Sequence, residues 1–301
     1  MAIPTPLVRE TPATAAAPRS ANALVELAKP GVTGLVTVTL LTGALTAPGH
    51  ISAARLAVAV VGTVLVVASA NSLNMYLERD TDALMSRTRN RPLPSGRLAP
   101  EAVLAYAAIT AVLGLSLLGA FVGALPTLLT LLALVSYVAC YTPLKRITPL
   151  ALIAGAVPGA LPPLIGWASV TGSLSTLAWM QFSILFVWQL PHFLAIAIFR
   201  REEYARAGMK VLPVVHGVQR TKIEIAAYSL LLALVSLAPI GLGLAGFAYA
   251  VVALVSGLAF LALATAGFGA KNERRWARRV FFASMPYLVI VLGALAAFAG
   301  D

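Results

Sequence analysis

The stretch AARLAVAVVGTVLVVASANSLNMYLERDTD, residues 53–82, decides the fold class of this chain. No charged residue lies between Leu56 and Leu77, and an apolar run of about twenty residues can cross a bilayer as one helix. The whole chain has only 11 acidic residues, and this run ends in three of them: Glu78, Asp80 and Asp82. Carboxylates beside a bilayer are costly to desolvate unless they meet partners, so the cluster predicts a functional site at the end of a membrane helix.

The composition extends this prediction to the whole chain. Of 301 residues, 59% are hydrophobic and 11% charged, and the mean hydropathy is +0.89. These values are typical of a polytopic membrane protein and exclude a soluble domain. Cys140 is the single cysteine, which excludes a disulfide framework and a cysteine-based metal site. The net charge of +11 does not indicate nucleic-acid binding, because the basic residues are gathered in particular loops.

Nine apolar segments are long enough to be transmembrane helices. We therefore predict an all-α, polytopic membrane bundle of nine helices. The segments lie near residues 27–48, 53–79, 101–120, 125–144, 149–168, 174–199, 222–242, 244–268 and 279–299.

The loops between these segments alternate in charge. The loops at 79–97, 145–146, 200–222 and 271–279 are rich in Lys and Arg, and the loops between them contain neither. By the positive-inside rule, the N-terminus and the charged loops are cytoplasmic and the C-terminus is periplasmic. Residues 1–22, rich in Pro, Ala and Thr, are expected to form a disordered tail that lacks the apolar core of a signal peptide. We expect residues 23–301 to form one transmembrane domain.

The acidic helix end has the donor types of a Mg²⁺ site. Asn74, Glu78 and Asp82 recur on one stripe of a helix that also includes Asn71, whereas Asp80 points away from it. Amide and carboxylate oxygens are the ligands that Mg²⁺ takes, usually together with substrate phosphates. The alternative is an ordinary helix end held by local ion pairs such as Glu78 with Arg79.

Basic residues follow this stripe closely, and cations bind phosphate oxygens. In the string R-T-R-N-R-P-L-P-S-G-R at 87–97, two prolines stiffen the loop and Gly96 allows a tight turn. A second pair follows Pro143 at the end of the fourth segment. These cations could equally be positive-inside anchors. The candidates for diphosphate binding are Arg87, Arg91, Arg97, Lys145, Arg146 and Arg200.

The sixth segment carries W-Q-L-P-H-F at 188–193 and ends before a second acidic pair. Pro191 is expected to kink the helix, so that neighbours or a cavity must satisfy the freed carbonyls. Trp188, Gln189 and His192 beside the kink are candidates for contact with a substrate. The alternative for His192 is a hydrogen-bonded structural role. Glu203, with Glu202, is the candidate for a second metal site facing the first.

No nucleophile–base pair, Walker loop or dinucleotide motif accompanies these residues. The pattern instead predicts a leaving diphosphate, neutralised by Mg²⁺ and cations, next to an apolar cavity that excludes water. A secondary transporter is the alternative from another class. Transporters place their charges near the bilayer midplane, whereas these charges gather at one rim.

Several further strings give a family resemblance. The N-x-x-x-E-x-x-x-D element at 74–82 resembles the first acidic motif of the UbiA superfamily of intramembrane prenyltransferases. The haem-prenylating branch is the most similar one. The strings that carry the resemblance are L-A-K-P at 27–30, N-R-P-L-P-S-G-R at 90–97, Y-T-P-L-K-R-I-T-P at 141–149, G-A-V-P-G-A-L-P-P-L-I-G-W at 155–167, W-Q-L-P-H-F at 188–193 and Y-A-R-A-G-M-K-V-L-P-V-V-H-G at 204–217.

The resemblance implies a UbiA-like bundle in a bacterial inner membrane, with its active site on the cytoplasmic side. Farnesyl diphosphate and protohaem IX would be the substrates, with Mg²⁺ as cofactor; a quinone-ring precursor or a lipid is the alternative acceptor. By position, Asn74, Glu78 and Asp82 would hold one Mg²⁺, with Glu203 near a second, and His192 would contact the haem. The resemblance also implies a possible protein partner, either a haem A synthase or an oxidase-assembly protein. The chain departs from the pattern at Gly31, where Arg is usual, and in its R-E-E-Y second motif.

Overall fold

The computed structural model describes residues 20–298, and within that range every regular element is helical. The predicted tail lies outside the described residues except for positions 20–22, which open the first helix. The helices are α1 (Ser20–Leu27), α2 (Pro30–Thr46), α3 (Ala53–Ala83), α4 (Pro100–Phe121), α5 (Ala124–Val135), the π-helix η1 (Ser136–Tyr141), α6 (Thr142–Leu144), α7 (Ala151–Ala160), α8 (Pro162–Thr171), α9 (Thr176–Phe199), α10 (Arg201–Arg206), α11 (Leu212–Val215), α12 (Gly217–Gly241), α13 (Phe247–Thr265), the 3₁₀ helix η2 (Ala266–Gly269) and α14 (Glu273–Phe298).

Each of the nine apolar segments expected from the sequence contains a helix. Within residues 20–298, eight helical segments are long and apolar enough to cross a membrane, and α2, with 17 residues, is a shorter apolar helix. Large apolar side chains cover their outer faces, for example Val112, Phe247 and Val289. The structure is therefore that of an integral membrane protein, in which the outward apolar surface faces lipid. The orientation of the termini across the membrane remains a prediction.

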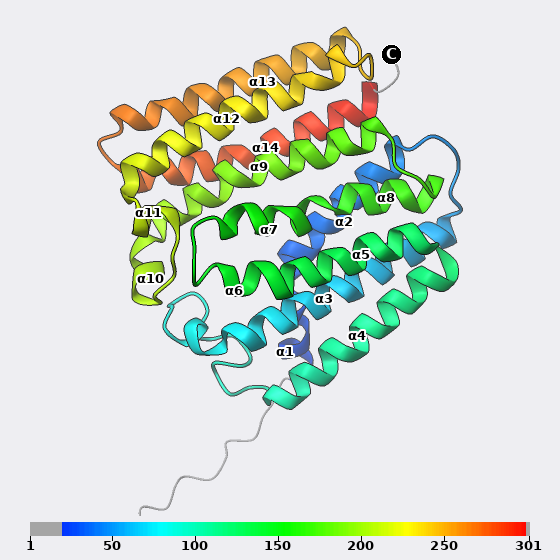
Figure 1. The fold of residues 1–301 in the computed structure, drawn as a ribbon, viewed down its shortest axis with the longest axis vertical. Coiled ribbons are helices and arrows are strands. Elements are labelled where there is room, and N and C mark those ends of the chain that lie inside the picture. The colour runs from blue at the N-terminus through cyan, green and yellow to red at the C-terminus, as the bar shows by residue number, and fades with distance from the viewer. Residues whose placement is uncertain (1–19, 299–301) are drawn as a thin grey trace, which may run out of the picture.

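Successive long helices run antiparallel, so that alternate connections meet at the same end of the bundle (Figure 1). The loop after α3, the short helices α10 and α11, and the start of α14 all lie at one end. Ser86 in that loop donates a hydrogen bond to Glu203 of α10, and Lys222 of α12 pairs with Glu273 of α14 at 2.8 Å. The charged loops of the sequence thus share one end of the bundle.

The core divides between two groups of helices. One apolar cluster joins α9 to α12, α13 and α14, and another joins α2, α5, α8 and the start of α9. Buried hydroxyls add hydrogen bonds between helices, since the Tyr249 hydroxyl donates to the carbonyl of Ser236, whose own hydroxyl bonds that of Tyr287. Packing and such bonds hold helices together where lipid supplies no hydrophobic drive. In Figure 1, α2 lies behind α7 and α8, inside the bundle.

Two glycines allow α2 and α8 to cross at backbone contact. A Cβ at Gly43 would lie 2.0 Å from the carbonyl oxygen of Pro163, and one at Gly166 would lie 1.9 Å from that of Leu40. Backbone atoms cannot move aside as a flexible side chain can, so both positions require glycine. The crossing fixes α2 against α8.

We predict that Gly43→Ala and Gly166→Ala each destabilise the protein by about 1–3 kcal/mol or more, because the added methyl overpacks the crossing. Gly34→Ala is the matched control on α2, since no atom of residues 20–298 lies within 4 Å of a Cβ there. Thermal unfolding in detergent micelles measures the difference. Equal midpoints for Gly43→Ala and Gly34→Ala would contradict the close crossing.

Candidate active site

The predicted polar stripe forms at the C-terminal end of α3. Asn74, Glu78 and Asp82 recur every fourth residue on one face of the helix, and they are 2%, 2% and 1% exposed. Asp80 lies off this face, with its side chain 83% exposed. The helical period therefore separates the buried acids from the exposed one, as the sequence predicted.

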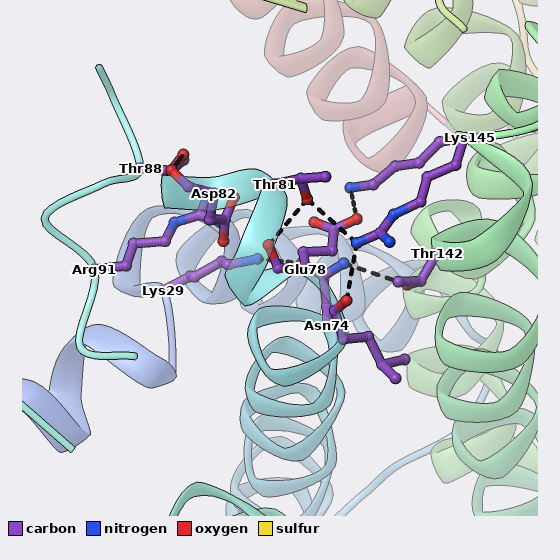
Figure 2. Close-up of polar contacts among 11 residues, drawn as sticks. Lys29, Asn74, Glu78, Thr81, Asp82, Thr88, Arg91, Thr142 and Lys145 are labelled. Carbon is purple, nitrogen blue, oxygen red and sulfur yellow. Dashed lines mark hydrogen bonds and ion pairs between the residues drawn. The ribbon is translucent and has the colours of Figure 1, made fainter. Parts of the chain in front are cut away.

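Three cations from three separate segments converge on this stripe (Figure 2). Lys29 Nζ, from the joint between α1 and α2, donates to Asn74 Oδ1 at 3.0 Å. Arg91 Nη1, from the loop after α3, donates to Asp82 Oδ2 at 2.6 Å. Lys145, directly after α6, forms an ion pair with Glu78. Each polar side chain of the stripe thus has a cationic partner, which is what buried carboxylates require.

Lys29 reaches the stripe from a left-handed backbone conformation. Its φ is 48°, and it is the only residue other than glycine with a positive φ in the described part of the chain. The turn is held in place by Asn71, whose amide donates to the carbonyl of Ala28, and by Thr33, whose hydroxyl donates to the same carbonyl. A non-glycine residue in this region of φ is strained, and such strain is common at functional sites. Sequence reasoning missed Lys29 as a site residue, although its string L-A-K-P was noted.

The segment before Lys145 is shaped by Pro143. Proline has no backbone N–H to donate to the preceding turn, and the helix widens into the π-helix η1 just before it. Thr142 then lies against the stripe: its hydroxyl accepts from Asn74 Nδ2 at 3.2 Å and donates to the carbonyl of Tyr137. Thr142 is a second site residue that sequence reasoning missed, for which the Pro143 break was the available signal.

Arg146 serves a different group from its neighbour Lys145. Its Nη2 donates to the carbonyl of Leu77 at 2.9 Å and lies 3.3 Å from the hydroxyl of Thr81. It therefore adds positive charge beside the last two turns of α3, toward the negative end of the helix dipole. Burial lowers the pKa of Lys145 to about 7, and the nearby charges of Lys29 and Arg146 act in the same direction. A site in which cations are crowded in this way favours an added anion.

The predicted arginine loop forms a cavity beside the stripe. A cavity of about 540 Å³ is lined by polar residues from α1 and from the loop after α3. Arg91 belongs both to this cavity and to the Asp82 ion pair, so the cavity adjoins the stripe. Arg97 binds both carboxylate oxygens of Glu26, at 2.9 and 2.5 Å, which links the loop after α3 to α1. The lining residues are Glu26, Arg87, Asn90, Arg91, Ser95 and Arg97.

The second acidic pair lies at the same end of the bundle, on α10. Arg200 Nη1 donates to Glu203 Oε1 at 2.7 Å, while Glu202 is exposed. Partial burial acts to raise the pKa of Glu203, but the hydrogen bond and charge of Arg200 outweigh it, so the pKa is lowered. Within the described residues, no group of three or more His, Cys, Asp or Glu side chains could form an all-protein metal site.

The donor set on α3 nevertheless fits a Mg²⁺ ion. Glu78 Oε1 is buried and accepts no hydrogen bond within residues 20–298, and its partner there is the ion pair with Lys145. Mg²⁺ is held by one or two carboxylates and completed by substrate phosphates and water. Two buried carboxylates, one amide oxygen and a neighbouring cationic cavity are that kind of incomplete site.

The W-Q-L-P-H-F residues form a separate set between α9, α7 and α14. Gln189 Nε2 donates to the carbonyl of Ala156 at 3.0 Å, and its Oε1 faces Gly159, where a Cβ would lie 2.0 Å away. Trp188 and His192 both contact Ser284 of α14. α9 remains one continuous helix through Pro191. Ser284 is the third residue that sequence reasoning did not place in the site.

The fold and the site together define an integral membrane protein with buried carboxylates and converging cations at one end of its helical bundle. Residues 35–285 match the UbiA prenyltransferase family, and the chain belongs to that family.

Two similar proteins share the name protoheme IX farnesyltransferase. The chain is 51% identical over 242 residues to a protoheme IX farnesyltransferase of Sorangium cellulosum, covering 80% of this chain and 86% of that protein. It is 46% identical over 272 residues to one of Anaeromyxobacter dehalogenans, covering 90% and 92% of the two chains.

Solved structures share the fold. A digeranylgeranylglyceryl phosphate synthase superposes with a TM-score of 0.77 at 16% identity, over 92% of this chain and 97% of the other. A UbiA homolog from Archaeoglobus fulgidus bound to DMAPP and Mg²⁺ superposes with a TM-score of 0.70 at 14% identity, over 92% and 100%.

We predict that Lys145→Met destabilises the protein by about 3–5 kcal/mol, because it leaves the buried Glu78 carboxylate without a counter-charge. The double variant Glu78→Gln with Lys145→Met should recover most of this loss. Arg220→Gln, which removes the exposed partner of Glu224, is the control and should cost less than about 1 kcal/mol. Thermal unfolding in detergent measures all three, and a Lys145→Met midpoint equal to that of the control would contradict the buried pair.

Proposed function

We propose that this chain transfers a farnesyl group from farnesyl diphosphate to a vinyl group of protohaem IX, which gives haem O and releases diphosphate. Relatives with the name protoheme IX farnesyltransferase, 46% identical over nine-tenths of the chain, support the reaction. The buried acid–cation arrangement around Asn74, Glu78 and Asp82 is the observation in this molecule that carries it.

Asn74, Glu78 and Asp82 would hold Mg²⁺ through their side-chain oxygens. The ion, when bound, neutralises charge on the leaving diphosphate. Glu203, with Glu202, remains the candidate for a second ion, and its lowered pKa keeps the carboxylate ionised as a ligand must be. The Archaeoglobus fulgidus homolog was solved bound to DMAPP and Mg²⁺, and the pairing of a metal with a prenyl diphosphate proposed for this chain is of the same kind.

The cations around the stripe would bind the diphosphate. Arg91 and Lys145 each touch a carboxylate on one side, and Arg91 also faces the cavity lined by Arg87 and Arg97. With a metal on the carboxylates and a diphosphate in the cavity, every charge would keep a partner of opposite sign. Arg146 and Arg200 would add positive charge at the rim. These groups stabilise the diphosphate as the carbon–oxygen bond to the farnesyl group breaks.

The acceptor would lie toward α9, where Trp188, Gln189 and His192 are candidates for contact with the haem. Aromatic faces in this region would stabilise an allylic cation, and the apolar walls would exclude water until the cation has been captured. The farnesyl cation would add to the vinyl group, which leaves a new carbocation. One water molecule would then add to that carbocation and lose a proton, so that atoms and charge are conserved. The positive loops would place this chemistry on the cytoplasmic side of a bacterial inner membrane.

A quinone-ring precursor or a lipid is the alternative acceptor. The likeness to the solved structures concerns the fold alone and does not choose between acceptors. The haem acceptor is favoured by His192 in W-Q-L-P-H-F and by the names of the relatives. A haem A synthase or an oxidase-assembly protein would be the partner that receives or uses the product.

The purified protein, given haemin, farnesyl diphosphate and Mg²⁺, should form a farnesylated haem that is detected by extraction and mass analysis. Removal of Mg²⁺ with a chelator should abolish product. A farnesyl group found only on an added quinone precursor would show that this precursor, rather than haem, is the acceptor. If no acceptor leads to diphosphate release, the protein is not a prenyltransferase.

Asp82→Asn should lower product formation by about 10²–10³-fold and raise the Mg²⁺ concentration that half-saturates the rate, because it removes a charged ligand. Asp80→Asn is the matched control two residues away, since its exposed carboxylate lies off the stripe. Initial rates across a Mg²⁺ titration distinguish the two. An equal loss of rate in both variants would show that the stripe does not bind the metal.

A further inference from the structure

Ser284 of α14 is the meeting point of two side chains from α9. The indole Nε1 of Trp188 donates to its carbonyl oxygen at 2.6 Å, and Nδ1 of His192 lies 2.7 Å from its hydroxyl. Ser284 is wholly buried, and α9 and α14 pack along their lengths. One serine therefore holds both the tryptophan and the histidine of W-Q-L-P-H-F.

Proton counting assigns the tautomer of His192. The Ser284 hydroxyl also lies 2.6 Å from the carbonyl oxygen of Phe281, which can only accept a hydrogen bond. A hydroxyl has one proton, so Ser284 donates it to Phe281 and accepts at its lone pair from His192. Nδ1 of His192 must then carry a proton. In a neutral imidazole the other nitrogen, Nε2, is left with a free lone pair.

The surroundings of the ring suit a neutral imidazole with one reactive nitrogen. Its face stacks on Trp188 with the centroids 4.6 Å apart, and Phe281 lies 4.7 Å away on a tilted plane. Among the described residues, no carboxylate pairs with His192 and no group hydrogen-bonds Nε2. His192 is largely buried, at 8% exposed, but it is not wholly enclosed by protein.

We propose that Ser284 is a positioning residue, which holds His192 as the Nδ1–H tautomer so that Nε2 offers its lone pair to the iron of the haem acceptor. The inference rests on the proposed function, because it takes protohaem as the acceptor. Coordination forms an iron–nitrogen bond from that lone pair, and no proton has to leave, because Nε2 is already unprotonated. The hydrogen bond from Nδ1 to a fixed acceptor orients the ring and raises its basicity, as such partners do for other metal-bound histidines.

The tautomer can be measured without haem. The chain has three histidines, so ¹⁵N-histidine labelling gives few signals, and His192→Gln identifies those of His192. At alkaline pH the protein in detergent should show a protonated Nδ1 and an unprotonated Nε2 at this residue. Ser284→Ala should shift the populations toward the Nε2–H form, and Ser284→Thr should restore the original state. A protonated Nε2 in the unaltered protein would overturn the inference, whatever reaction the protein catalyses.

Haemin binding tests the consequence for the acceptor. The absorption spectrum of bound haemin should show a nitrogen-ligated iron that is lost in His192→Gln. Ser284→Ala should weaken haemin binding about 10–100-fold, while Ser284→Thr retains it. Ser229→Ala is the control, because it removes a buried hydroxyl whose hydrogen bond among the described residues is to Ile225 of its own helix.

The outcomes of these experiments separate the two proposals. If the unaltered protein binds no haemin, the haem acceptor fails together with this inference, although the tautomer is still decided by the nitrogen spectrum. If haemin is bound and farnesylated but its spectrum and affinity are the same in Ser284→Ala and Ser229→Ala, the proposed function stands and the inference is overturned. A loss of affinity in Ser284→Ala with an unchanged unfolding midpoint supports positioning rather than a fold defect.

Discussion

The burial of two carboxylates at the end of a membrane helix is the constraint on which the rest of the structure depends. Glu78 and Asp82 are almost wholly enclosed, in a region where unpaired charge is very costly. Their counter-charges, Lys145 and Arg91, come from other segments of the chain, and Lys29 completes the set at Asn74. The protein can therefore bury its acids only when three distant parts of the bundle have reached their native positions.

Local backbone features bring those cations to the stripe. The left-handed turn at Lys29 directs the chain into α2, and the Pro143 break widens the preceding helix so that Thr142 and Lys145 lie against α3. The close crossing at Gly43 and Gly166 then holds α2 against α8. The strained turn, the helix break and the glycine crossing each cost conformational energy or freedom. Together they give a preorganised polar site at one end of the bundle.

The polar residues divide into two sets with different chemistry. Around α3 the groups are charged, and they suit a metal-bound diphosphate. Between α9 and α14 the groups are aromatic or neutral, with Trp188, His192 and Ser284 linked by hydrogen bonds and ring stacking. This division would suit the proposed reaction, because a hydrophilic leaving group and a flat, largely apolar acceptor need different surroundings. The family's membrane fold accommodates both sets in one bundle.

The sequence by itself determined the nine apolar segments, their approximate bounds and the stripe of Asn74, Glu78 and Asp82. These follow from hydropathy and from the helical period, which depend only on residues close together in the chain. Only the tertiary structure decided which polar groups meet at the stripe, because Lys29 lies 45 residues from Asn74, and Thr142 lies 68 residues from it. Ser284 lies 92 residues from His192 and was likewise out of reach of any local pattern. A contact between helices depends on how they cross and rotate, and that is settled by packing over the whole bundle rather than by any single segment.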